Sequence, residues 1–234
     1  MMEANKYINQ TYPPINRTSI KILDVSSKNL TNTINLGPSD NFTSILELNA
    51  SFNQINNFNI SQLSLQTMDF SHNNLINFSM YIPSALEIIN LSHNSLSDIG
   101  PISDILTHLD ISNNLLTYLD LHNYKHLVSL NCSANPDLSN LTLNSYFDPS
   151  DSSAFDCRGT NLGKINTTSF TFDCQTGSKT IKKTVPDTHS PITPDINFYT
   201  GIIIGMCIII IVFIVAMLVY KRLRKVLNYE IICY

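Results

Sequence analysis

The sequence lacks the short motifs that mark the common catalytic and nucleotide-binding sites. It has no glycine-rich phosphate loop, no dinucleotide fingerprint and no zinc motif. Its five cysteines include no close pair and no histidine partner at the spacing of metal ligands. No serine, histidine and acid can be singled out as a nucleophile with its base and orienting group. The sequence therefore predicts no metal, no cofactor and no enzymatic activity.

An excess of basic charge and a hydrophobic leader are missing as well. The formal net charge is −4, with 14 Lys and Arg against 18 Asp and Glu, which excludes the basic surface that binds nucleic acids. The first 30 residues contain no continuous apolar stretch of the kind that forms a signal peptide. Nucleic acid is therefore not an expected partner, and export of the chain needs other support from the sequence.

One eleven-residue phrase is repeated six times between Ile20 and Leu138. In the clearest copy, 86–96 (LEIINLSHNSL), apolar residues stand at places one, four, six and eleven, and Asn stands at place nine. The copies begin at Ile20, Ile45, Leu65, Leu86, Leu106 and Leu127, which are 25, 20, 21, 20 and 21 residues apart. A repeat of this period predicts a solenoid, in which each unit packs on its neighbours.

The phrase resembles the leucine-rich repeat, L-x-x-L-x-L-x-x-N-x-L, over roughly the first three quarters of the chain. The resemblance implies a horseshoe-like solenoid with parallel strands along one concave surface. The alternation at places four to six is itself typical of a strand with one buried face. About ten residues remain after each phrase, too few for a turn and a helix of ordinary length. We therefore expect a mainly β solenoid with an extended or single-turn helical convex side.

Asparagine at place nine is the most regular polar feature of the repeat. An asparagine side chain carries two donors and an acceptor, so it can bond backbone groups of adjacent turns that would otherwise stay unpaired. We expect a structural ladder formed by Asn53, Asn73, Asn94, Asn114 and Asn135. Lys28 takes this place in the first copy, which predicts an irregular end of the solenoid. Apolar residues are expected to cover that end, among them Ile8, Tyr12 and Ile15.

The exposed places of the strands carry short polar side chains. Place five alternates between Asp and Asn along the copies, and place seven is Ser in all six. Such a face suits a cationic or hydroxyl-rich ligand, or its short polar residues serve only the backbone of a tightly curved strand edge. The candidate ligand-binding residues are Asp69, His72, Asn90, His93, His108 and Asp110. An alternative hypothesis joins the three histidines near Asp69 in a metal or pH-sensing site.

The cysteines allow two interpretations of the C-terminal end of the solenoid. Cys157 and Cys174 each follow a Phe-Asp pair, as at place six of two degenerate repeats, and Cys132 occupies place six of its own copy. Three successive strands would then hold a column of buried thiols about 4.8 Å apart. The resemblance to leucine-rich repeats implies the alternative, a disulfide-bonded cap that joins Cys157 and Cys174.

A second strong pattern lies near the C-terminus. Residues 201–219 (GIIIGMCIIIIVFIVAMLV) contain no charge and are bounded by Tyr199 and Tyr220, which predicts a transmembrane helix at 199–220. The predicted order is an N-terminal cap at 1–19, a solenoid at 20–176, a Ser/Thr/Pro-rich stalk at 177–198, the helix, and a short basic tail at 221–234. The solenoid is expected to hold six clear repeats and two degenerate ones.

The orientation of the predicted helix has two solutions. Lys221, Arg222, Arg224 and Lys225 follow it at once, which places the tail in the cytosol and the repeats outside the cell or in the lumen. Eleven Asn-x-Ser/Thr sequons also favour export and a glycoprotein. Because the first 30 residues lack a leader, either the true start lies upstream or the chain is tail-anchored with its repeats in the cytosol.

These patterns together predict a binding protein at a membrane. We expect a single-pass protein, receptor-like or adhesive, that crosses the lipid bilayer through 199–220 and binds a protein ligand on its concave face. Because the tail is too short for a catalytic domain, any signal would pass through a membrane co-receptor. The alternative is a tail-anchored adaptor that recruits proteins to an organelle membrane.

Overall fold

The computed structural model describes residues 1–36, 40–60, 64–78, 84–149 and 152–182. Within these ranges, no helix is long and apolar enough to cross a membrane. The predicted transmembrane helix at 199–220 and the basic tail at 221–234 lie outside the described residues, as does the expected stalk from residue 183 onward. The structure therefore bears on the solenoid and its two ends.

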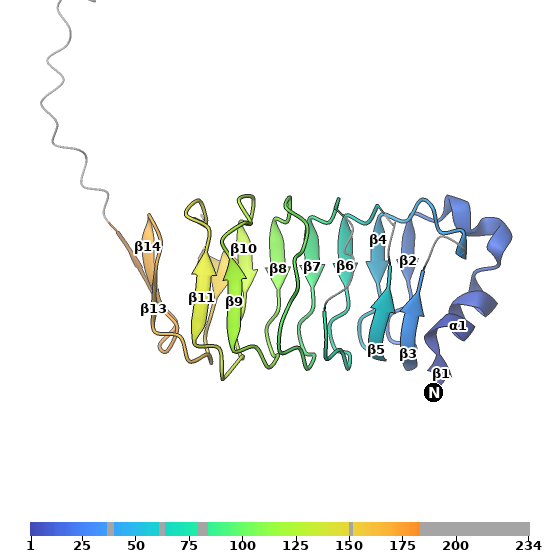
Figure 1. The fold of residues 1–234 in the computed structure, drawn as a ribbon, viewed down its shortest axis with the longest axis horizontal. Helices are drawn as coiled ribbons and strands as arrows, with labels where there is room; N and C mark the ends of the chain where they lie inside the picture. The colour runs from blue at the N-terminus through green and yellow to red at the C-terminus, as the bar shows by residue number, and fades with distance from the viewer. Residues whose placement is uncertain (37–39, 61–63, 79–83, 150–151, 183–234) are drawn as a thin grey trace, which may run out of the picture. The chain divides into compact units, whose positions relative to one another are not determined.

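A seven-stranded parallel sheet, which we call the main sheet, forms one side of a β-solenoid (Figure 1). Each of the six repeat phrases supplies one strand, and a seventh strand follows them. In chain order the strands are β2 (Ile22–Asp24), β4 (Glu47–Asn49), β6 (Thr67–Asp69), β7 (Ile88–Asn90), β8 (His108–Asp110), β10 (Ser129–Asn131) and β12 (Phe155–Asp156). Neighbouring strands pair place by place, so that Leu130 at place four lies between Leu109 and Phe155.

The apolar places of the phrase form the core of the solenoid. Side chains at places four and six point inward and are buried, as Leu23 and Val25 are in the first copy and Met68 and Phe70 are in the third. Six of these strands have three residues each and the seventh has two, too few to be stable alone. Their stability therefore comes from the stacking of successive turns over one continuous core.

The side of the solenoid opposite the main sheet is extended, as expected. There β3 (Leu30–Asn35) pairs with β1 (Met2–Glu3) and β5 (Gln54–Asn59), and β9 (Tyr118–Leu121) pairs with β11 (Asn140–Leu143), all in parallel. Phe58, from this side, packs against Phe70 and Phe78 at centroid distances of 4.9 and 5.5 Å. The structure confirms a mainly β solenoid with few helices.

The asparagines at place nine join each turn to the preceding one. In Asn73, Nδ2 donates to the carbonyl of Ala50 in the preceding turn at 2.9 Å, and Oδ1 accepts the backbone N–H of Ile55 there at 2.9 Å. Its Nδ2 also donates to two carbonyls of its own turn, those of Phe70 and Ser71. The same bonds recur at Asn53, Asn94, Asn114 and Asn135. Each asparagine therefore satisfies four or more backbone groups, and all of these asparagines except the half-buried Asn94 are buried.

The N-terminal end of the solenoid is covered by β1, the helix α1 (Ala4–Thr11) and the 3₁₀ helix η1 (Pro14–Ser19). Ile8 of α1 is buried and Tyr12 is half-buried, as predicted, whereas Ile15 is 87% exposed, so its predicted place in the cap is wrong. Arg17 takes the buried position of η1 instead. Its guanidinium donates to the Tyr12 carbonyl at 2.7 Å and lies over the Phe42 ring, so the buried charge is hydrogen-bonded and stacked on an aromatic face.

The C-terminal end confirms one of the two predicted degenerate strands and corrects the other. Phe155 and Asp156 form the seventh parallel strand, β12, and Thr160 replaces Asn at place nine by donating to the Cys157 carbonyl at 2.7 Å. Beyond it the chain forms an antiparallel sheet of β13 (Lys164–Asn166), β14 (Phe170–Asp173) and β15 (Ser178–Ile181). The stretch that was expected to be an eighth repeat strand is β14, which pairs with its sequence neighbours. The expected start of the stalk at residue 177 is also wrong, because β15 pairs with β14.

The thiol column proposed from the sequence is wrong for two of its three members. Cys157 and Cys174 form a disulfide with a Cα–Cα distance of 5.0 Å, while Cys132 is a buried free thiol. The strand separation that would stack two inward cysteines is also short enough for them to bond, and β14 brings Cys174 beside Cys157. Burial raises the pKa of the Cys132 thiol to about 12. Cys132 is therefore a small core residue, and the bridge closes the C-terminal end.

The disulfide gives a direct labelling prediction. Under denaturing, nonreducing conditions, alkylation of the full chain should modify Cys132 but leave the Cys157 and Cys174 peptides joined and unmodified, because a bridged sulfur has no thiol. Reduction before alkylation should add a label at each of those two positions. Peptide mass spectrometry measures both. Labelling of Cys157 and Cys174 without reduction would restore the thiol column.

The place-nine bonds predict a stability difference between two adjacent asparagines. Asn73→Ala leaves several buried backbone groups unpaired and should lower the free energy of unfolding by about 2–4 kcal/mol. Asn74→Ala, at an exposed position, should change it by less than about 0.5 kcal/mol. Urea unfolding of the full chain, followed by circular dichroism, measures both. Equal effects would show that Asn73 does not hold the turns together.

Candidate binding face

The solvent-facing side of the main sheet carries four of the six predicted ligand-binding residues, namely Asp69, Asn90, His108 and Asp110. Side chains at places three and five are exposed or half-buried there, and place seven follows just past the strand ends. We call this surface the polar sheet face. Place five forms a row across all seven strands in which Asp and Asn alternate: Asp24, Asn49, Asp69, Asn90, Asp110, Asn131 and Asp156. Asp69, Asn90 and Asp110 of the predicted site therefore lie on three adjacent strands.

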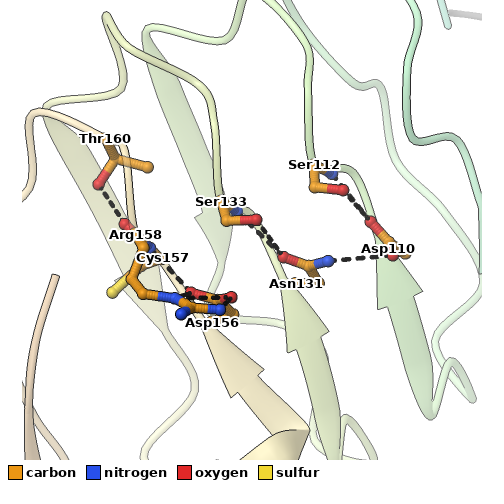
Figure 2. Close-up of polar contacts among 8 residues, drawn as sticks. All are labelled: Asp110, Ser112, Asn131, Ser133, Asp156, Cys157, Arg158 and Thr160. Atoms are coloured by element: carbon orange, nitrogen blue, oxygen red, sulfur yellow. Dashed lines mark hydrogen bonds and ion pairs between the residues drawn. The ribbon is translucent and has the colours of Figure 1, made fainter. Parts of the chain in front are cut away.

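The place-five side chains have a common structural role. In each, Oδ1 accepts the backbone N–H of place seven, two residues on, at 2.8–3.2 Å. The Ser112 and Ser133 hydroxyls also donate to Oδ1 of Asp110 and Asn131, both at 2.7 Å (Figure 2). Asp and Asn both provide this oxygen, which explains why either residue serves at place five. The structural interpretation of this row therefore accounts for Oδ1 in every turn.

Cross-strand contacts and hydrogen bonds hold the side chains of this row in place. Asn131 donates from Nδ2 to Oδ2 of Asp110 at 3.1 Å, which joins β10 to β8 (Figure 2). The backbone N–H and then the hydroxyl of Ser26 lower the pKa of Asp24 below its ordinary value. Because each Asp is separated from the next by an Asn, no two carboxylates face each other on neighbouring strands. The face therefore holds spaced negative charges.

Arg158 neutralises the C-terminal end of the polar sheet face. At place seven of the last strand, its guanidinium bonds both carboxylate oxygens of Asp156, with Nη2 to Oδ2 at 2.6 Å (Figure 2). Gly177 makes room for the arginine stem, since a Cβ there would lie 2.7 Å from Arg158 Cδ. The repeat did not identify Arg158, because place seven is Ser in all six copies, a set that we call the serine column. The acidic part of the face thus extends from Asp24 to Asp110.

A stack of three rings borders the polar sheet face. Phe52, His72 and His93 occupy place eight in successive turns, with centroid distances of 4.1 and 4.0 Å and an interplanar angle of 12° in each pair. All three have a φ of 54°, in the left-handed region that non-glycine residues rarely adopt. Phe52 was not predicted as a site residue, and the place that it shares with the two histidines is the signal that identifies it.

The alternative of a histidine metal site is not supported by this geometry. His72 and His93 meet face to face, and His108 lies apart at place three of β8, where Nδ1 and the Thr107 hydroxyl are hydrogen-bonded at 2.9 Å. Among the residues that the structure describes, no cluster of three His, Cys, Asp or Glu side chains could hold a metal ion. The structure therefore does not bring His108 together with the other two histidines.

Burial and the neighbouring imidazole lower the pKa of His72. Partial desolvation is the larger cause, and the His93 ring adds to it, while Asp69 acts in the opposite direction. The folded state therefore favours neutral His72 at neutral pH. Rings at 4.0 Å stack well when uncharged, so the aromatic edge is most stable above the ordinary histidine pKa.

No protein-family model matches this chain, and no curated protein matches its sequence.

The lowered pKa of His72 predicts acid sensitivity. Its folded pKa lies below the ordinary value of 6.5, so on acidification the unfolded chain takes up the proton first. The free energy of unfolding should stay level above the ordinary histidine pKa of 6.5 and fall as the pH drops below that value. His72→Asn should reduce this fall, because Asn is neutral and accepts the same φ, as Asn113 does at place eight.

His108→Asn is the matched control, since His108 is exposed on the same face outside the stack. Urea midpoints of the three full-length chains between about pH 7.5 and pH 5 give the comparison. If His72→Asn and His108→Asn change the pH dependence equally, the stack does not carry it.

Proposed function

We propose that this chain is a membrane-anchored member of the leucine-rich-repeat proteins that binds a protein ligand on its polar sheet face, without catalytic activity of its own. The observation that carries the proposal is the continuous face formed by the place-five side chains of seven strands, with the place-three side chains of six strands beside them. An extended surface of this kind suits a macromolecule better than a small molecule, which binds in an enclosed, mostly apolar cavity.

The repeat itself supports membership of the leucine-rich-repeat proteins. The phrase has the apolar places and the asparagine of that repeat, and its copies form one parallel strand each. The asparagines occupy the turn out of the strand and bond the preceding turn, as a solenoid of short units requires. The repeat pattern and these bonds between turns together support the proposed membership.

The charges of the face favour a ligand with basic side chains. Asp24, Asp69 and Asp110 stand on alternate strands, and Glu47 adds a carboxylate at place three of β4. Exposed Ile88, at place three of β7, and Phe52, in the ring stack beside the face, add apolar area. Spaced acids around apolar side chains match the composition of protein interfaces, in which charge selects the partner and apolar burial supplies affinity.

The serine column supports a structural role rather than a nucleophilic one. Ser51, Ser71, Ser92 and Ser112 are buried, and the described bonds of the Ser112 and Ser133 hydroxyls run to place five. A hydroxyl that donates to a carboxylate or amide oxygen in the same strand turn is not presented to a substrate. A binding role for the face therefore needs no reactive serine.

The disulfide supports an extracellular or lumenal location for the repeats. Bonds such as Cys157–Cys174 form and persist in oxidising compartments and are rare in the cytosol. Together with basic residues directly after the apolar segment 199–220, this favours repeats outside and a cytosolic tail. The proposed anchor would hold the polar sheet face where another exported protein can reach it.

Site-specific photo-crosslinking tests the binding face. A photoreactive residue at Ile88, on the polar sheet face, should capture a specific protein when the full chain is expressed in its native cells. The same residue at Ile76 is the matched control, because Ile76 is also an exposed isoleucine but lies outside the main sheet. Mass spectrometry of the adducts identifies the captured protein.

A pair of arginine substitutions then tests the surface without the crosslinker. Ile88→Arg should abolish co-purification of the captured protein, because a long cation occupies the centre of the face. Ile76→Arg should leave it unchanged. Capture from Ile76 as strong as from Ile88, or unchanged co-purification with Ile88→Arg, would contradict a ligand on this face.

A further inference from the structure

The structure divides the Asn-x-Ser/Thr sequons of the chain into two groups. Of the eleven sequons, nine lie entirely within the described residues. Three of these have their asparagine at place five of the main sheet: Asn49, Asn90 and Asn131. The other six lie elsewhere: Asn9, Asn16, Asn29, Asn41, Asn140 and Asn166. Burial and hydrogen bonding differ between the two groups.

The six asparagines outside the main sheet are open for a sugar. Each is exposed. Where the structure gives them side-chain hydrogen bonds, Oδ1 is the atom used: Asn9 accepts from Arg17, Asn29 from Gln54 and Asn166 from Thr171. A glycan is linked through Nδ2, so these bonds can persist in the modified chain.

The three asparagines of the main sheet are confined on both sides. Each is half-buried and stands between two aspartates of the neighbouring strands, which lie about 4.8 Å away. Nδ2 of Asn131 also donates to Asp110 Oδ2 at 3.1 Å, a bond that a linked sugar would disturb. The hydroxyl residues Ser51 and Ser92 of two of these sequons are buried. A branched sugar here would cover the neighbouring strands of the polar sheet face.

Folding can exclude the three main-sheet asparagines from glycosylation at an early stage. Every main-sheet strand pairs with strands about 20–25 residues away in the sequence, and a solenoid of such local contacts forms turn by turn. A place-five asparagine is therefore enclosed once the adjacent turns have formed. The exposed asparagines stay accessible in the folded chain.

We propose that N-linked glycans occupy Asn9, Asn16, Asn29, Asn41, Asn140 and Asn166 while Asn49, Asn90 and Asn131 remain unmodified. This inference rests on the proposed function for the lumenal location and for the role of the polar sheet face. In the reaction, Nδ2 forms a bond to C1 of the first sugar of a lipid-pyrophosphate-linked oligosaccharide. The bond from C1 to phosphate breaks, the lipid pyrophosphate leaves, and the amide proton passes to a base. The sugars would all lie outside the main sheet and leave the polar sheet face free for a protein.

Two expressed forms separate this inference from the proposed function. The full chain is expressed in eukaryotic cells once as it stands and once with a cleavable signal sequence. Enzymatic removal of N-glycans in ¹⁸O-water converts each modified Asn to labelled Asp, which peptide mass spectrometry locates. The form with the signal sequence should carry label at the six exposed positions and none at Asn49, Asn90 or Asn131. Label at any of those three overturns the inference, whatever the natural topology.

The form without an added signal sequence tests the proposed function instead. It should show the same pattern. If it carries no label while the other form is modified as expected, the lumenal location is overturned and the division of the sites stands.

Two single substitutions give a matched control. Asp110→Asn and Asp137→Asn each create a new sequon, because Ser112 and Ser139 follow two residues on. The first lies on the polar sheet face and keeps the Oδ1 that accepts the Ser112 N–H, as Asn does at this place in other turns. The second is exposed and outside the main sheet. Asp137→Asn should gain one glycan and Asp110→Asn none; a gain with Asp110→Asn would overturn the inference.

Discussion

The buried amide of asparagine at place nine is the interaction on which this solenoid depends. Its Nδ2 donates to a carbonyl of the preceding turn, and its Oδ1 accepts an N–H of that preceding turn. Asn114 makes these two bonds with Leu91 and Leu96. To point this side chain inward, the residue before it adopts the left-handed region, which costs about 1–2 kcal/mol for a residue other than glycine. The bonds made by each asparagine offset that cost, and the repeated geometry aligns the strands place by place.

The surface chemistry follows from the same backbone demands. Where the chain leaves each strand, the N–H of place seven needs an acceptor, and a short Asp or Asn at place five supplies it. A polar face is therefore a consequence of the fold before it is a binding site. The proposed function relies on the negative charges of the place-five aspartates, on the exposed Ile88 and on the stacked rings that begin at Phe52. Sugars on the remaining surface would direct a ligand to this side.

Much of the fold could be predicted from the repeat, because residue types at fixed places of the phrase specify the register of the strands. The phrase located six strands and the asparagine column, and its extension to Phe155 found a seventh strand. It failed at Phe172, since an apolar-Asp-Cys pattern does not encode strand direction, and β14 runs antiparallel to β13. The left-handed place eight left no trace in the sequence, because Ser, Phe, His, Asn and Ala all occur there. The ring stack and the Arg158–Asp156 pair depend on that backbone and on packing, which residue types alone do not specify.

Native-state hydrogen exchange of the place-eleven amides tests the central role of the asparagine column most directly. The N–H groups of Ile55, Leu75, Leu96 and Leu116 each donate to the side chain of an asparagine in the next turn. If these bonds hold the turns together, the four amides should exchange as slowly as amides that bond to a neighbouring main-sheet strand, such as the Leu91 N–H that donates to the Asp110 carbonyl of β8. Exchange as fast as in exposed loops would contradict the account.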